Sequence, residues 1–264
     1  MTALGDARHE VRGPGGSTGG AEDAGHLADA GHTGTPSGDD GGAERAERDG
    51  LVAAAAHLAG LGLSPGSSGN ISVRVADRVL ITPTGTDMAA LDPARLSVLD
   101  LDGNHLDGPA PSKEFPLHLA FYRRDPAHRA VVHLHSRHAA AASCRTPWSA
   151  RSALPPLTPY FVMRVGQTPL LPYAPPGDPA QGAALELLPF PCRAALLQNH
   201  GPVVTGTSLR AATEAAVELE ETSALCLLLG DHPVRLLTTD EAVALADRYG
   251  TYWTEDAERP PAEA

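Results

Sequence analysis

The chain of 264 residues carries 32 acidic and 20 basic residues, for a formal net charge of −12. This balance disfavours nucleic-acid binding, because the neutralisation of phosphates needs a basic surface. There is no apolar run of membrane-spanning length and no signal-like apolar segment in the first fifty residues, and the three widely spaced cysteines fit neither a disulfide framework nor a structural zinc site. We therefore expect a soluble cytoplasmic protein without membrane or nucleic-acid partners.

Composition divides the chain into three parts. Residues 1–45 hold 12 of the 27 glycines and almost no large apolar side chain, so this segment cannot bury enough surface to offset its backbone entropy. We predict that it is a disordered, low-complexity N-terminal arm. Residues 46–250 carry the apolar periodicity of one folded domain, and residues 251–264 form a polar C-terminal tail.

The folded part is predicted to begin with a helix and a hairpin. Alanine and leucine at helical spacing indicate a helix from about Glu44, which Gly60 and Gly62 end. Alternating side chains then predict strands at 71–75 and 78–82. Two loops rich in hydroxyls, amides and glycine flank this hairpin.

These two loops, at 64–70 and 83–86, allow two interpretations. Small residues let backbone NH groups approach phosphate oxygens, and Asn70 and Thr84 add side-chain donors, so the loops are suited to anion binding. Turn chemistry alone explains the same residues, with Gly85 as an ordinary turn glycine. Taken by themselves, the loops favour the turn interpretation, because turn chemistry explains these residues fully.

A short strand is predicted at 97–102, and a helix follows the motif Pro-Ser-Lys-Glu at 111–114. Ser112 is the predicted N-cap, and Pro116 is tolerated in the first helical turn. Lys113 and Glu114 then lie at the positive end of the helix, whose free NH groups can also hold an anion.

Two histidines stand on a strand predicted at 129–136. Because alternate side chains of a strand point to one face, His133 and His135 project together. Neutral imidazole is a common ligand of divalent transition metals, so the pair is half of a chelate. The alternative is a half-buried strand with two hydrogen-bonded histidines. Ser136 is the predicted N-cap of a helix at 137–143.

The segment 145–177 is rich in proline and lacks periodicity, which predicts a long loop of functional importance. Tyr160 lies in it, as a packed aromatic residue or an acid catalyst. Residues 193–204 predict a buried strand, a tight turn and a second strand, with His200 at the end of the first. Further helices are predicted at 178–188, 209–229 and 240–248, and Glu214, Glu218 and Glu221 are expected on a mostly solvated face.

The order of these motifs is more specific than any one of them. A Gly-Asn loop, a Thr-Gly loop, Ser-Lys-Glu before a helix, His-x-His-Ser and a later Asn-His-Gly follow one another. This order resembles the class II aldolase/adducin family over residues 47–245, a family that includes fuculose-phosphate aldolases and ribulose-phosphate epimerases. The motifs at 111–114, 131–136 and 158–166 look most like those of the 3-oxo-tetronate 4-phosphate decarboxylases of that family.

The resemblance implies a fold and a site. The fold would be a single α/β/α domain at 46–250, with a central, largely antiparallel sheet covered by helices. His133, His135 and His200 would bind a divalent metal ion, with zinc favoured, and Glu114 would be a fourth ligand or an acid/base. The residues implied to bind the substrate and its phosphate are Asn70, Thr84, Gly85, Ser112 and Lys113.

The resemblance also implies a reaction. A 3-oxo-tetronate 4-phosphate is a β-keto acid, so its decarboxylation to dihydroxyacetone phosphate passes through an enediolate that a metal ion stabilises. Glu114, with help from Tyr160, would protonate the carbanion, which requires a raised pKa of Glu114. Aldolases of the family usually have Ser-Ser-Glu where this chain has Ser112-Lys113-Glu114, and this difference argues against a simple aldolase. Lys113 would pair with the phosphate or carboxylate of the substrate.

Several alternatives stay open. Aldol cleavage and 4-epimerisation of a sugar phosphate use the same kind of metal site, and only the decarboxylase releases carbon dioxide. A metal-free, adducin-like interaction module predicts loss of the histidines, all of which are present. A zinc hydrolase would need a dedicated water-activating carboxylate and no phosphate loops. Family members are commonly homotetramers with active sites near a subunit boundary, so we expect a homo-oligomer.

Overall fold

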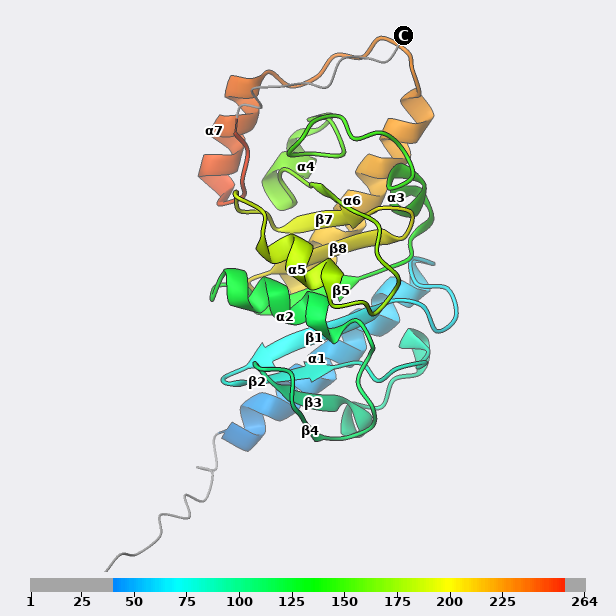
Figure 1. Ribbon diagram of the computed structural model, residues 1–264, viewed down its shortest axis with the longest axis vertical. Helices are drawn as coiled ribbons and strands as arrows, with labels where there is room; N and C mark the ends of the chain where they lie inside the picture. The colour runs from blue at the N-terminus through cyan, green and yellow to red at the C-terminus, as the bar shows by residue number, and fades with distance from the viewer. Residues whose placement is uncertain (1–39, 255–264) are drawn as a thin grey trace, which may run out of the picture. The chain divides into compact units, whose positions relative to one another are not determined.

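A computed structural model describes residues 40–254, and the predicted arm up to residue 39 and the tail from 255 lie outside this range (Figure 1). The first helix, α1 (Asp40–Gly60), begins five residues before the predicted end of the arm at residue 45. Glu44 and Arg48 explain this earlier start. They form an ion pair of 2.8 Å across one helical turn, and Arg48 donates to the carbonyl of Pro93 at 3.1 Å. These contacts fix the first turns of α1 to the rest of the fold.

The centre of the molecule is an eight-stranded sheet in the order β4-β3-β2-β1-β5-β8-β7-β6. All neighbouring pairs are antiparallel except β6 and β7, which confirms the predicted, largely antiparallel sheet. The strands are β1 (Asn70–Val75), β2 (Arg78–Ile81), β3 (Ser97–Asp100), β4 (His105–Asp107), β5 (Ala130–His133), β6 (Leu170–Leu171), β7 (Ala194–Leu197) and β8 (Gly201–Gly206).

Helices cover both faces of the sheet, as the α/β/α prediction requires (Figure 1). Alternate residues of one strand enter different cores: Val132 packs with one group of helices and Val131 with the other. One face carries α2 (Phe115–Arg124) and α5 (Ala180–Glu186). The other carries α1, α3 (Arg137–Ala142), α4 (Pro159–Arg164), α6 (Leu209–Leu229) and α7 (Thr239–Tyr249).

Several predicted elements are confirmed, and the predicted long loop needs correction. The hairpin, the strand-turn-strand unit around His200 and the 209–229 helix are present, and Ser208 caps α6 by accepting from the Ala211 amide at 3.1 Å. The segment 145–177 is not a structureless loop, because Thr158 caps α4 within it and β6 follows. No helix of residues 40–254 is long and apolar enough to cross a membrane.

Ser112 is not the N-cap of α2. Its carbonyl accepts from the Phe115 amide at 3.2 Å and its hydroxyl from the Glu114 amide at 3.4 Å, so it forms a tight turn before the helix. Glu114 therefore occupies the N-cap position, with Pro116 in the first turn. This turn brings the carboxylate of Glu114 to the end of the helix that faces the sheet.

Candidate active site

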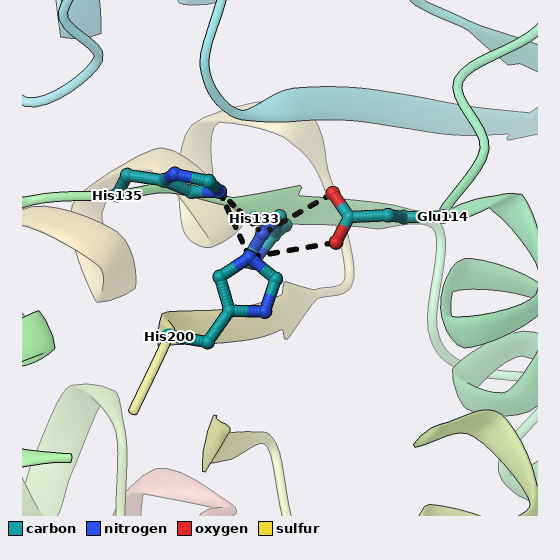
Figure 2. A group of neighbouring side chains, drawn as sticks. All are labelled: Glu114, His133, His135 and His200. Carbon is teal, nitrogen blue, oxygen red and sulfur yellow. Dashed lines mark hydrogen bonds and ion pairs between the residues drawn. The ribbon is translucent and has the colours of Figure 1, made fainter. Parts of the chain in front are cut away.

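Four side chains from separate elements converge on one point. Glu114 precedes α2, His133 ends β5, His135 follows two residues later, and His200 lies between β7 and β8 (Figure 2). The Nε2 atom of His135 is 3.2 Å from that of His133 and 3.0 Å from that of His200. Glu114 completes the group, with Oε2 at 3.3 Å from His133 Nε2 and Oε1 at 3.6 Å from His200 Nε2. The structure thus brings together the four predicted metal-binding residues.

The backbone of β5 and β8 fixes the first histidine. His133 is fully buried and pairs with Val203 across the two strands. Its Nδ1 atom donates to the carbonyl of Pro202 at 2.9 Å, so the neutral ring carries its lone pair on Nε2. That lone pair points into the cluster, which is the orientation a metal ligand needs.

The Asn-His-Gly motif holds the third histidine through a strained turn. Asn199 has φ of 59°, a left-handed conformation that asparagine tolerates better than most residues. The amides of Asn199 and His200 donate to the carbonyl and hydroxyl of Ser143, both at 3.2 Å. At Gly201 any Cβ would collide with the carbonyl oxygen of Leu134, so the position requires glycine. Each residue of the Asn-His-Gly motif therefore has a structural role in shaping or anchoring this turn.

A buried carboxylate caps the helix α3, which directly follows His135. Glu220 of α6 accepts from the amides of His138 and Ala139, at 3.0 and 2.8 Å, and from the His138 ring at 2.8 Å. It therefore caps the N-terminus of α3, directly after His135, where the hydroxyl of Ser136 was predicted to do so. Burial raises the pKa of Glu220, but these hydrogen bonds more than offset that effect and the pKa is lowered. The carboxylate stays charged at the positive end of α3.

The environment keeps the three histidines neutral. Burial lowers the pKa of His133, His135 and His200, to about 4 for His200. Burial raises the pKa of the Glu114 carboxyl, but His133, the Asn70 amide and His200 more than offset this, and the pKa lies below its ordinary value of 4.5. Near neutral pH the site holds three uncharged imidazoles and one carboxylate.

This donor set fits a divalent metal ion. Imidazole lone pairs that face one another at 3.0–3.2 Å repel unless a proton or cation lies among them. The Oε1 atom of Glu114 is buried and accepts no hydrogen bond from the residues that the structure describes. Ligands about 2.0–2.1 Å from a tetrahedral zinc ion lie roughly 3.3–3.4 Å apart, close to the separations seen here. Three nitrogens and one carboxylate oxygen are ligands that zinc accepts.

The predicted substrate-binding residues meet beside the metal cluster. A pocket of about 180 Å³ lies between the two loops that flank the hairpin and the start of α2. The pocket is lined by Asn70, Thr84, Gly85, Ser112 and Lys113, together with Glu114 and His135. Residues that the sequence alone left as turns therefore share one cavity with the candidate metal ligands.

Residues 49–227 match the family described as the Class II Aldolase and Adducin N-terminal domain. The chain belongs to the class II aldolase/adducin family. It is 47% identical over 186 residues to the 3-oxo-tetronate 4-phosphate decarboxylase of Pectobacterium atrosepticum, covering 70% of this chain and 85% of that protein. It is 34% identical to the L-fuculose phosphate aldolase of Escherichia coli K12, covering 73% and 88%. These matches confirm the predicted family and the predicted lyase class.

Solved structures of the family agree with the fold. The crystal structure of YgbL from Escherichia coli is similar to this class II aldolase/adducin domain with a TM-score of 0.73 and 43% identity, covering 77% of this chain and 99% of that one. The predicted α/β fold with a largely antiparallel sheet is confirmed by this similarity and by the strand order described above.

Tyr160 does not join the cluster within one chain of this family member. Its side chain is 57% exposed at the start of α4, and the Arg164 guanidinium lies over its ring at 5.3 Å from the centroid. Tyr160 is also not among the residues that line the pocket beside Glu114. Within one chain, the exposed Tyr160 side chain therefore makes no contact with the candidate site.

Three polar residues that were not predicted from the sequence lie behind Glu114: Ser72, His118 and Tyr122. Asn70 donates from Nδ2 to Glu114 Oε2 at 2.7 Å, and its Oδ1 is 2.5 Å from His118 Nε2. Ser72 Oγ is 2.7 Å from both His118 Nδ1 and the Tyr122 hydroxyl. The signal was in the spacing: residues 114, 118 and 122 share one helix face, and 70 and 72 share one strand face. Polar residues at those periods inside a core indicate a network.

Proposed function

We propose that this chain decarboxylates a 3-oxo-tetronate 4-phosphate to dihydroxyacetone phosphate and carbon dioxide. One observation carries the proposal. A pocket lined by the two hydroxyl- and glycine-rich loops and by Lys113 also contains Glu114 and His135 of the metal cluster. The chain is 42–47% identical to five relatives named 3-oxo-tetronate 4-phosphate decarboxylase. The identity to L-fuculose phosphate aldolases is lower, at 33–34%.

The chemistry of the substrate defines what the site must do. When the carbon–carbon bond to the carboxylate breaks, its electron pair moves toward the neighbouring ketone, and an enediolate forms. A divalent cation bound by Glu114, His133, His135 and His200, for which zinc is our choice, would supply Lewis-acid stabilisation of this negative charge. The neutral imidazoles suit this task, because they need not lose protons before they bind the cation.

The loops and the start of α2 hold the rest of the substrate. Thr84, Gly85 and Ser112 would donate to the phosphate oxygens from backbone and hydroxyl groups. Lys113 adds a compact positive charge at the rim of the same pocket. Asn70 would also bind the substrate. Its side-chain amide bonds to Glu114 and His118, and its second N–H remains for the pocket.

The lowered pKa of Glu114 changes the role we assign to it. A residue that already carries the proton for the carbanion near neutral pH would need a raised pKa. The pKa of Glu114 is lowered instead. Glu114 therefore starts the reaction as a carboxylate, and a proton delivered through it has to be taken up during turnover. Where Glu114 acts as acid/base rather than as a metal ligand, Oε1 is the atom available for that transfer, because Asn70 occupies Oε2.

Tyr160 is our candidate for a residue donated between subunits of a homo-oligomer, which we propose to be a tetramer in the cytoplasm. We expect Tyr160→Phe to lower kcat about ten- to a hundredfold through loss of a general acid, with metal content and stability unchanged because the side chain is exposed. Alone, Tyr160→Phe should keep only about 1–10% of the wild-type turnover, and His133→Ala about 0.1% or less. Mixed, dissociated and reassembled, the two variants should regain activity, since some sites then receive an intact cluster and an intact tyrosine. Absence of recovery in verified mixed oligomers would exclude the shared site.

The test of the proposed function is a product assay. The purified protein should release carbon dioxide and dihydroxyacetone phosphate in equal amounts from 3-oxo-tetronate 4-phosphate. Chelation should stop the release, and added zinc should restore it. A protein that binds zinc and releases no carbon dioxide would contradict the decarboxylase. Assays with sugar 1-phosphates would then decide for an aldolase, the activity by which its 33–34% identical relatives are named.

A further inference from the structure

The polar network behind Glu114 runs through the core between α2 and β1. Its members are all buried: Asn70 is 4% exposed, Tyr122 3%, and Ser72 and His118 0%. Groups this deep must find partners inside the protein, because water cannot solvate them. Glu114 lies at one end of the network and the Tyr122 hydroxyl at the other.

The donor at each step follows from the chemistry of its partner. An ionised carboxylate has only acceptors, so the Asn70 atom beside Glu114 is the NH₂ group and its oxygen faces His118. His118 must then carry its proton on Nε2, which leaves Nδ1 as an acceptor for the Ser72 hydroxyl. Because that hydroxyl is used as a donor, Tyr122 must donate to Ser72. The chain of hydrogen bonds has one direction, toward Glu114.

This direction distinguishes the two oxygens of the carboxylate. Oε2 receives the Asn70 amide, and Oε1 is left without a donor on the side of His200. Were the imidazole of His118 to carry its proton on Nδ1, the Asn70 amide would turn over and place its oxygen against the carboxylate. The Nε2 proton of His118 is therefore what keeps the amide in the orientation that Glu114 needs.

We propose that His118 is a positioning residue, which sets the Asn70 amide through its Nε2 proton and so presents Glu114 with Oε2 occupied and Oε1 free. On the far side of the ring, the Ser72 hydroxyl donates to the bare Nδ1 of this tautomer, and Tyr122 donates to Ser72. His118 does not line the substrate pocket, and among residues 40–254 its side chain bonds to Ser72 and Asn70 rather than to the three histidines, so it acts through Asn70. The effect on turnover rests on the proposed decarboxylase activity, whereas the tautomer does not.

The activity test compares two buried histidines. His118→Phe should lower kcat about ten- to a hundredfold with little change in KM, the scale typical of residues that orient others at a metal site. His128→Phe is the matched control, because His128 is 4% exposed and bonds to the Phe121 carbonyl at 3.0 Å, away from Glu114. His118→Gln should restore most of the loss, since its amide can donate to Asn70 and accept from Ser72. Equal losses in both phenylalanine variants would overturn the proposal.

A double-mutant cycle tests the route through Asn70. If His118 acts through that amide, the double variant His118→Phe/Asn70→Ala should lose no more kcat than Asn70→Ala alone. If the two residues act independently, the two fold losses in kcat should multiply. Should His118→Phe fail to fold, Tyr122→Phe replaces it in the cycle, since it removes only the terminal hydroxyl and should give a smaller, equally non-additive loss. Multiplying effects would overturn the route.

Nitrogen NMR of the metal-free protein gives a readout without turnover. With ¹⁵N-labelled histidine, His118 should show a protonated Nε2 and a bare Nδ1 at neutral pH, and this pattern should weaken in Ser72→Ala. A protonated Nδ1 or a freely exchanging ring would overturn the proposal even in an active enzyme. If the wild-type protein releases no carbon dioxide but shows the predicted tautomer, the proposed function fails and the positioning network stands.

Discussion

Replacing His133 by alanine is expected to abolish stoichiometric metal binding and to lower kcat at least about a thousandfold. A bound cation stabilises the developing charge by several kcal/mol, and each 1.4 kcal/mol corresponds to a factor of ten in rate. His133 is the ligand whose orientation is most firmly fixed, since it is fully buried and its Nδ1 donates to Pro202. Metal content of the purified protein, a chelator competition and the carbon dioxide assay measure the effect.

The control for this substitution is His128→Ala, which removes another buried histidine that lies outside the cluster. Both variants leave a cavity of similar size, so both should lose stability by about 2–4 kcal/mol. The control should retain its metal and most of its activity. A His133→Ala protein with one zinc ion per chain and wild-type turnover would contradict the assignment of the metal site.

The metal ligands were accessible from sequence for a geometric reason. His133 and His135 are two positions apart, so strand alternation placed them on one face, although β5 ends at His133 and His135 lies just beyond it. His200 follows a buried strand, and functional side chains of α/β proteins often lie at the ends of such strands. The link between His200 and the other two came from the resemblance to the family, because strand order cannot be read from spacing alone. The sheet places β8 beside β5 and so unites them.

Other features depend on contacts that cross the fold. The cap of α3 comes from Glu220, 82 residues beyond His138, and no local pattern announces it. The same holds for Asn70, which bonds to Glu114 across 44 residues and alters the balance of its pKa. Burial of a carboxyl group suggested a raised pKa, yet the partners that burial brings near it decide the direction. Such partners appear only once helix and strand are packed.

Replacing Glu114 by glutamine is expected to lower kcat about a hundred- to ten-thousandfold, the range typical of a lost acid/base group. The amide matches the carboxylate in size, and its oxygen can still accept from Asn70, so the network behind it stays intact. The variant therefore removes the charge and little else. Metal affinity, measured in parallel, reports the second role: a large fall identifies Glu114 as a ligand, and an unchanged value as acid/base alone.

The pH dependence of the loss in Glu114→Gln shows whether Glu114 begins turnover as a carboxylate or as a protonated acid. A carboxyl group with a lowered pKa is ionised at every pH well above 4.5, so Glu114 has the same charge at pH 6 and pH 8. The ratio of wild-type to Glu114→Gln turnover should then be constant between these values. A group with a raised pKa would lose its proton across this window, and the wild-type advantage would shrink as the pH rises. A shrinking ratio would show that Glu114 begins turnover as a protonated acid, whereas a constant ratio would show that it is a carboxylate throughout this window, and the metal affinity then separates ligand from acid/base.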